Sequence, residues 1–223
     1  MPKASYPKTT QERAKLYLHC MVEIKERLNI ANGVLQSDLG ALFANEICCL
    51  QYRHICELIA IACLAAQGDF KTQRAFRESY SPGQIFNALR GLYPHFFPQP
   101  STITRRDEGY HFEANQKPDA YKEEDVISLW NKCGDDLHRA SVDKYLKKAF
   151  KPPRDIAVHQ RHMTGLVRLL ATHLVTIETG TGRVLLDVRL RDEEDNVVAN
   201  FMTIDPETNS IQIEAYKSKL VGR

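Results

Sequence analysis

A stripe of charged residues near the middle of the chain has a spacing that could support chemistry on a helix. Glu46, Arg53 and Glu57 are separated by seven and four positions, which places them along one side of an α-helix. Arg53 can therefore bridge two carboxylates, and His54 lies beside it. Such a stripe either faces a functional cleft or forms a solvated edge or a salt bridge between helices.

A second polar group follows the sole tryptophan, Trp130, and ends in His138 and Arg139. The amphipathic pattern places His138 at the carboxyl end of a helix. The helix dipole favours a protonated histidine there, so capping is enough to explain its position.

Arg154 and His159 form a third pair at the start of the last long helical segment, and the polar Asp155 follows the arginine. Other arginine and histidine pairs at similar spacing contain a proline or a glycine turn, or lack that polar neighbour. A step of five residues turns about 140° around a helix. The two side chains therefore share a pocket only if the helix start is distorted or a partner subunit completes the site.

The order of arginine, polar residue and histidine in Arg154-Asp-Ile-Ala-Val-His159 is similar to the motif of HEPN-type helical domains. Many of these domains are metal-independent endoribonucleases of toxin and defence systems. The resemblance implies that His159 acts as acid or base at a ribose 2′-hydroxyl or a leaving oxygen. It also implies that Arg154 counters charge on the phosphate.

A broader resemblance rests on the segments 53–60, 133–138 and 169–173, which look like a group of bacterial proteins of no assigned function. If those proteins are divergent HEPN-like bundles, His138 takes the place of the family histidine. Asn131 and Lys132 stand where the family arginine is expected, which leaves Arg53 as its substitute. The candidate catalytic residues are therefore Arg154, His159, His138 and Arg53.

Charge is unevenly distributed along a chain whose total is nearly neutral, with 30 Lys and Arg against 28 Asp and Glu. Residues 144–168 contain seven basic residues and one acid, whereas 178–216 contain nine acids and three arginines. A basic cluster suits phosphate binding, because each neutralised phosphate releases counterions. The alternative is a solvated helical face. The candidate RNA-binding residues are Lys144, Lys147, Lys148, Lys151 and Arg161.

The periodicity predicts a mainly α fold, namely an antiparallel helical bundle with a small C-terminal antiparallel β-meander. The bundle, HEPN-like by resemblance, covers residues 1–180 and contains an irregular insertion at 93–121. The meander covers residues 181–223 and packs on the bundle. The predicted helices are 10–28, 38–66, 82–92, 123–139 and 154–177, with a shorter helical piece at 142–150. The predicted strands are a hairpin within 101–114 and three strands at 183–191, 197–204 and 211–216.

Several functional classes do not fit the composition. The start of the chain lacks the apolar stretch of a secretory signal, and the longest apolar run, Leu58 to Ala66, has nine residues against roughly 20 for a membrane span. We expect a cytoplasmic protein with no membrane partner. Cys49, Cys56 and Cys63 recur every seven residues, which predicts buried thiols rather than disulfides.

No cofactor and no metal site is predicted. His159 and His162 are one turn apart, with Asp155 one turn before His159, but the spacing supplies no further ligands. A glycine-rich phosphate loop is also missing, because Gly180-Thr-Gly182 precedes a strand rather than a helix.

Three functional hypotheses follow from these patterns. The leading one is an RNA-directed, HEPN-like protein of bacterial toxin or defence type, with metal-independent endoribonuclease chemistry as the implied activity. It would act as a homodimer and have a protein partner such as an antitoxin. The second is a non-catalytic helical protein-interaction module. The third is a small-molecule sensor with a pocket among Trp130, Tyr93, Phe96 and Phe97, aromatic residues that more often belong to a core.

Overall fold

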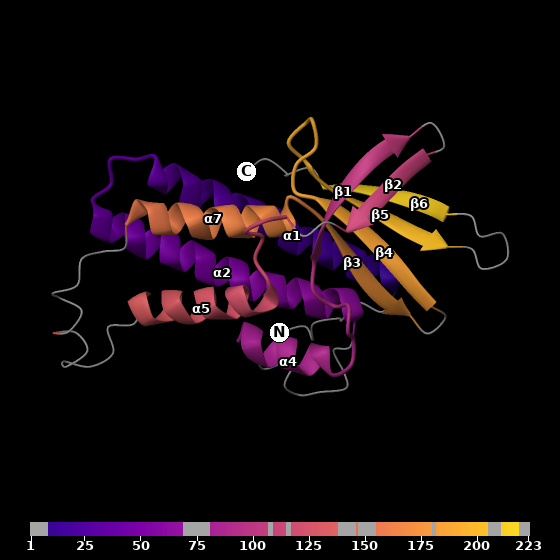
Figure 1. Ribbon diagram of the computed structural model, residues 1–223, viewed down its shortest axis with the longest axis horizontal. Coiled ribbons are helices and arrows are strands. Elements are labelled where there is room, and N and C mark those ends of the chain that lie inside the picture. The colour runs from indigo at the N-terminus through magenta and orange to yellow at the C-terminus, as the bar shows by residue number, and fades with distance from the viewer. Residues whose placement is uncertain are drawn as a thin grey trace, which may run out of the picture.

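Helices and strands occupy opposite sides of the molecule. The computed structural model describes residues 9–68, 81–106, 109–114, 117–137, 146, 155–179, 182–204 and 211–218. In these residues the helices gather on one side and the strands form a twisted sheet on the other (Figure 1). One continuous apolar core joins the two parts.

Two long helices form the centre of the helical part. α1 (Thr10–Leu35) begins at a capping box, in which the side chains of Thr9 and Glu12 each accept a hydrogen bond from the other residue's backbone N–H. The helix predicted for residues 10–28 is longer in the structure, where α1 continues through Asn32-Gly33 to Leu35. A helix can carry an isolated glycine at a cost of about 1 kcal/mol.

α2 (Ala41–Gln67) packs along α1 and ends at Gly68, close to the end of the helix predicted for residues 38–66. Gly68 has a φ of 68°, a left-handed conformation that glycine adopts without a steric penalty. Among the described helices, α2 is the one long and apolar enough to cross a membrane, and 61% of its most apolar window is buried inside the protein. Such burial is typical of the core helix of a folded domain.

Within the described residues, three shorter helices surround this pair: α4 (Pro82–Arg90), α5 (Glu123–Leu137) and α7 (Ile156–Leu170). α5 is antiparallel to α2, since Cys49 of α2 faces Asp136 and Glu57 faces Trp130. α7 lies alongside the central helices and leads directly into the sheet (Figure 1).

The sheet has six antiparallel strands in the order β2-β1-β3-β4-β5-β6. Its strands are β1 (Gln99–Arg106), β2 (Gly109–Ala114), β3 (Thr172–Thr179), β4 (Gly182–Arg189), β5 (Val197–Ile204) and β6 (Ile211–Ser218). The β1–β2 hairpin joins the rest of the sheet through Gln99 and Pro100, which pair with Leu174 and His173 of β3.

The prediction of a mainly α fold with a small three-stranded meander is wrong, because the sheet is twice that size and the fold is α+β. The last helix, predicted to reach residue 177, ends at Leu170, and Thr172–Thr179 is a strand instead. Five of these eight residues are β-branched, and such side chains pack well on a pleated surface. β3 pairs with β4 along its whole length, so residues on both sides of the predicted boundary at 180 share one sheet.

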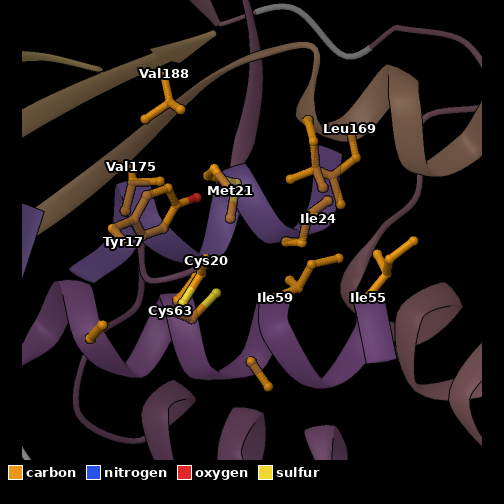
Figure 2. Packing of buried hydrophobic residues seen from close by; sticks show 14 of the residues in the cluster. Tyr17, Cys20, Met21, Ile24, Ile55, Ile59, Cys63, Leu169, Val175 and Val188 are labelled. Carbon is orange, nitrogen blue, oxygen red and sulfur yellow. The ribbon is translucent and has the colours of Figure 1, made fainter. Parts of the chain in front are cut away.

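The core lies between the central helices and one face of the sheet. Tyr17, Cys20, Met21 and Ile24 of α1 meet Ile55, Ile59 and Cys63 of α2, with Leu169, Val175 and Val188 closing the cluster (Figure 2). Val175 and Val188 point toward the helices because alternate residues of a strand share one face. The helices therefore cover this face of the sheet.

All six cysteines are buried as free thiols: Cys20, Cys48, Cys49, Cys56, Cys63 and Cys133. This confirms the prediction of buried thiols. Burial raises the pKa of the Cys20 thiol to about 12 and that of Cys48 to about 11, so both are protonated at neutral pH and are poor nucleophiles.

Candidate functional site

The arginine of the charged stripe packs between two helices. The guanidinium carbon of Arg53 lies 4.1 Å from the centroid of the Trp130 ring, and Arg53 Nε is 3.4 Å from Glu57 Oε1. The same carboxylate oxygen accepts a hydrogen bond from Trp130 Nε1 at 2.9 Å. One carboxylate therefore holds the cation and the indole together across the contact between α2 and α5.

A glycine of α5 makes room for this arginine. A Cβ at Gly134 would lie 2.3 Å from Arg53 Nη1, so the guanidinium rests against the bare backbone of the helix. The Arg53 side chain is only 17% exposed. These contacts support the interpretation of Arg53 as a residue that packs helices together.

His159 is enclosed between α7 and α2. It is 2% exposed, and its Nε2 lies 3.1 Å from Asn45 Oδ1. The Tyr52 ring stacks against it with 5.9 Å between centroids, and the Tyr52 hydroxyl donates to the His159 backbone oxygen at 2.9 Å. A general acid or base must come within hydrogen-bond reach of the substrate. In this structure the His159 imidazole contacts protein groups and is almost closed to solvent.

The structure does not bring Arg53 and His159 into one cleft. Tyr52, which contacts His159, and Arg53, which contacts α5, are consecutive residues of α2, and consecutive helical side chains point about 100° apart. Arg161 is an exposed residue of α7. The other predicted site residues lie outside the described residues: Arg154, His138, Lys144, Lys147, Lys148 and Lys151.

A buried tyrosine–histidine pair joins the first helix to the sheet, which sequence reasoning missed. His173 is fully buried, its Nδ1 lies 2.9 Å from the Leu170 backbone oxygen, and its Nε2 lies 2.7 Å from the Tyr17 hydroxyl. Desolvation by burial lowers the pKa of His173 to about 4. The ring is therefore neutral at pH 7, with Nδ1–H donating to Leu170 and Nε2 accepting from Tyr17. The alternation of His173, Val175 and Ile177 is the local signal of an inward-facing histidine on a strand.

Polar side chains also lie on the sheet face away from the core. Asp187 of β4 is fully buried, accepts a hydrogen bond from Asn200 Nδ2 at 2.9 Å, and lies 3.7 Å from Arg189 Nε. Desolvation raises the pKa of the Asp187 carboxyl. Residues 187 and 189 share this face because strand side chains alternate.

A cavity of about 440 Å³ opens between the connection from α4 to β1 and the segment that leads into α5. This volume falls within the range of small-ligand sites. Its walls combine prolines, aromatic rings and charged side chains: Pro94, His95, Phe97, Pro98, Gln99, Pro100, Lys117, Ala120, Tyr121, Lys122, Glu123 and Glu124. We refer to it as the aromatic cavity.

Two of its rings are held in fixed positions. Phe97 packs edge-on against Phe86 at 5.6 Å between centroids. The Tyr121 hydroxyl is hydrogen-bonded to His162 Nδ1, and the Tyr121 backbone N–H donates to the Gly165 oxygen at 3.1 Å. The ring lies so close to Gly165 that a Cβ there would be 2.1 Å from it. Fixed aromatic surfaces bind flat groups with little loss of conformational entropy.

The charged side chains that line the aromatic cavity differ in exposure and in ion pairing. Lys122 is exposed and Lys117 is half-buried, so the cavity has two ammonium groups on the segment before α5. Of the two carboxylates, Glu123 forms an ion pair with Arg90, while Glu124 is exposed. An anionic ligand would therefore meet the lysines and one uncompensated carboxylate.

Of the four aromatic residues of the predicted pocket, one lines the aromatic cavity. Phe97 lines the aromatic cavity, but Phe96 is buried in the core and Trp130 is held on Glu57. Tyr93 lines a different hollow, beside Arg13 and Gly68. The proline-rich run 94–100 is the sequence signal for the cavity, but its opposite wall comes from residues about 20 positions later.

Comparisons of the chain with protein-family models, with curated proteins and with solved structures find no match.

Proposed function

We propose that this protein binds single-stranded RNA and does not cut it through His159. In this proposal an unstacked base enters the aromatic cavity, and neighbouring phosphates contact Lys117 and Lys122. The observation that carries the proposal is the presence of two fixed aromatic rings and two lysines around one cavity. Aromatic rings that stack bases beside a basic track are the usual means of binding single strands.

The burial of His159 supports the non-catalytic part of the proposal, because its ring is 2% exposed. The predicted basic cluster at 144–168 supports an RNA partner, since Lys and Arg exceed acids there by six. Membership of a HEPN-like toxin or defence family stays a prediction from the sequence motif.

Fluorescence anisotropy of labelled single-stranded oligoadenylate tests the proposal. Two lysines on phosphates predict that the logarithm of affinity falls with the logarithm of salt concentration with a slope of about −1.4 or steeper, at about −0.7 per phosphate. Lys122→Gln should reduce this slope by about 0.7. Lys15→Gln is the matched control, because Lys15 is an exposed lysine of α1 that does not line the cavity.

Three results bear on the proposal directly. Equal affinities of the Lys122→Gln and Lys15→Gln variants would contradict the assigned site. Tyr121→Leu should weaken binding by about 1–3 kcal/mol, the contribution of one stacked base. Cleavage of the RNA by wild-type protein, lost in His159→Asn, would overturn the non-catalytic assignment.

A second candidate function, a protein-interaction module, is favoured by an apolar surface at one end of the helices. We define this end surface by Leu39, Leu42, Phe43 and Ile156, which are 44%, 54%, 61% and 49% exposed. These residues lie at one end of the molecule, because α2 and α7 contact each other close to their first residues. There Asn45 of α2 is hydrogen-bonded to His159 of α7. Clusters of exposed apolar side chains mark interaction sites more often than scattered ones do.

The partner proposed for the end surface is a second copy of the chain, as expected of a homodimer. Sedimentation velocity of wild type and Phe43→Glu tests it. A dimer that the Phe43→Glu substitution converts to monomer supports the proposal, whereas a monomer at every wild-type concentration refutes it. Ile213→Glu is the control, because Ile213 is an exposed apolar residue of β6 on the sheet.

A further inference from the structure

A second cavity of about 440 Å³ lies where α1, α7 and the end of β4 meet. It is separate from the aromatic cavity and shares no lining residue with it. Lys25, Asn29 and Asn32 of α1 line one side, and Arg191 lines another. The lining includes two cations and no acid.

Lys25 is an unusual lining residue because its side chain is only 2% exposed. Its ammonium lies 2.8 Å from a carboxylate oxygen of Asp195 and also donates to the Asp195 backbone oxygen. Asp195 belongs to the turn between β4 and β5, and its own side chain is 58% exposed. A buried ammonium is thus compensated by a carboxylate that reaches it from the surface.

Arg191 also contacts the Asp195 carboxylate. Its Nη1 is 3.1 Å from Asp195 Oδ1, and its Nη2 donates to Asn29 Oδ1. The neighbouring acid, Asp192, is held by Lys217 at 3.1 Å and by the backbone N–H groups of Glu194 and Asn196. Within these contacts two cations therefore share one carboxylate, while Glu193 and Glu194 of the same turn are exposed to solvent.

Hydrogen-bond donors remain for an anion among these side chains. An ammonium has three N–H donors and a guanidinium has five, and the contacts above use two of each. The Asn32 Oδ1 accepts from Gln36 Nε2, so the Asn32 amide N–H groups stay available at the exposed mouth. Charge-assisted hydrogen bonds of this kind are about twice as strong as neutral ones.

The rest of the lining is apolar. Leu28 of α1, Met163 and Val167 of α7, and Leu190 after β4 form the walls. A site with donors at one end and an apolar wall beside them suits an amphipathic molecule with an anionic head.

We propose that this cavity binds a small organic anion, with a carboxylate head on Arg191 and the Asn32 amide, beside the buried charge of Lys25, and an apolar body against Leu28 and Met163. The head shares the positive charge of Arg191 and Lys25 with the Asp195 side chain. The volume accommodates a chain of about eight carbons, a size typical of small-ligand sites.

Isothermal titration calorimetry with octanoate, and with the neutral octanamide as its matched probe, tests the proposal. Octanoate should bind at least about tenfold more tightly than octanamide, because one charged hydrogen bond is lost in the amide. Arg191→Gln should weaken octanoate binding at least about tenfold. Val167→Trp should abolish binding by filling the cavity, and it changes no charge.

Asp195→Asn should tighten octanoate binding, since it removes the competing charge and asparagine tolerates the φ of 61° at this position. Arg183→Gln is the control for Arg191→Gln, because Arg183 is equally exposed at the opposite end of β4. Circular dichroism establishes that each variant is folded. The proposal is overturned if wild type does not bind octanoate, if octanamide binds equally well, or if Arg191→Gln and Arg183→Gln behave alike.

Discussion

Protonation of His173 should destabilise this protein as the pH falls below 7. The ring is fully buried, accepts from Tyr17 and donates to the Leu170 backbone oxygen. A protonated ring would carry two donors, so the Tyr17 hydroxyl would have to rotate and accept from Nε2–H, and the charge of the ring would be buried. Desolvation accordingly lowers the pKa of His173 from its ordinary 6.5 to about 4.

The sign and size of the effect follow from linkage. A histidine whose folded pKa is depressed contributes its full stability above the unfolded pKa of 6.5, and that stability is lost as the pH falls toward 4. The full difference between the two pKa values corresponds to about 3 kcal/mol, of which about 2 kcal/mol is lost between pH 7 and pH 5.

Urea denaturation at pH 7, 6 and 5 measures this loss, with the fluorescence of Trp130, the sole tryptophan, as the probe. The reference is His173→Gln, which is less stable but cannot gain a proton in this range. Wild type should lose about 2 kcal/mol more than the variant between pH 7 and pH 5. Equal losses, or an NMR titration of the His173 ring with a midpoint near 6.5, would refute the reasoning.

Two further predictions concern packing and a buried charge. Gly165→Ala should reduce the free energy of unfolding by about 1–3 kcal/mol, because the new methyl group would meet the ring of Tyr121 at 2.1 Å. Gly134→Ala should cost less, because the new methyl group meets the far end of a long side chain, Arg53 Nη1, rather than a ring. Thermal unfolding of both variants compares them. Asp187→Asn should raise stability at pH 7 by about 1 kcal/mol, because desolvation raises the pKa of this carboxyl and makes its ionised form unfavourable.

Each of these predictions has a contradicting outcome. Equal destabilisation by Gly165→Ala and Gly134→Ala would show that the Tyr121 ring moves aside as easily as the Arg53 side chain does. The advantage of Asp187→Asn should shrink as the pH falls, since the wild-type carboxyl then becomes protonated. An advantage that grows toward acid pH would show that the ionised carboxylate stabilises the fold.

Local signals in the sequence predict the individual elements well. Gly68 ends α2, Ser81-Pro82 precedes α4, and Val197–Ile204 is a strand with the predicted bounds. These features depend on neighbouring residues, such as a glycine with positive φ or an alternating pattern, which can be seen within a short window. The prediction fails at Thr172–Thr179, because no glycine or proline separates this segment from the preceding helix and its apolar residues Leu174, Val175 and Ile177 fit a helical period as well as an alternating one.

The sites depend on contacts that a sequence does not display. His159 has the residue type and spacing of a catalytic histidine, but its partner Asn45 is 114 positions away and encloses it. The aromatic cavity has walls from two segments, and the buried Lys25 meets an acid 170 positions later. Periodicity places a residue on one face of an element, but tertiary packing decides whether that face is open.

The contact between Tyr17 and His173 also bears on how this protein is made. The two residues are 156 positions apart, so at about 5–20 residues per second a ribosome adds the histidine roughly 8–30 s after the tyrosine. During that interval α1 and α2 can pair with each other, but the side of α1 that contacts the sheet has no strands to cover it. A nascent chain in this state exposes an apolar surface, and we expect it to require a chaperone until the strands that contact α1, namely β3, β5 and β6, have been synthesised.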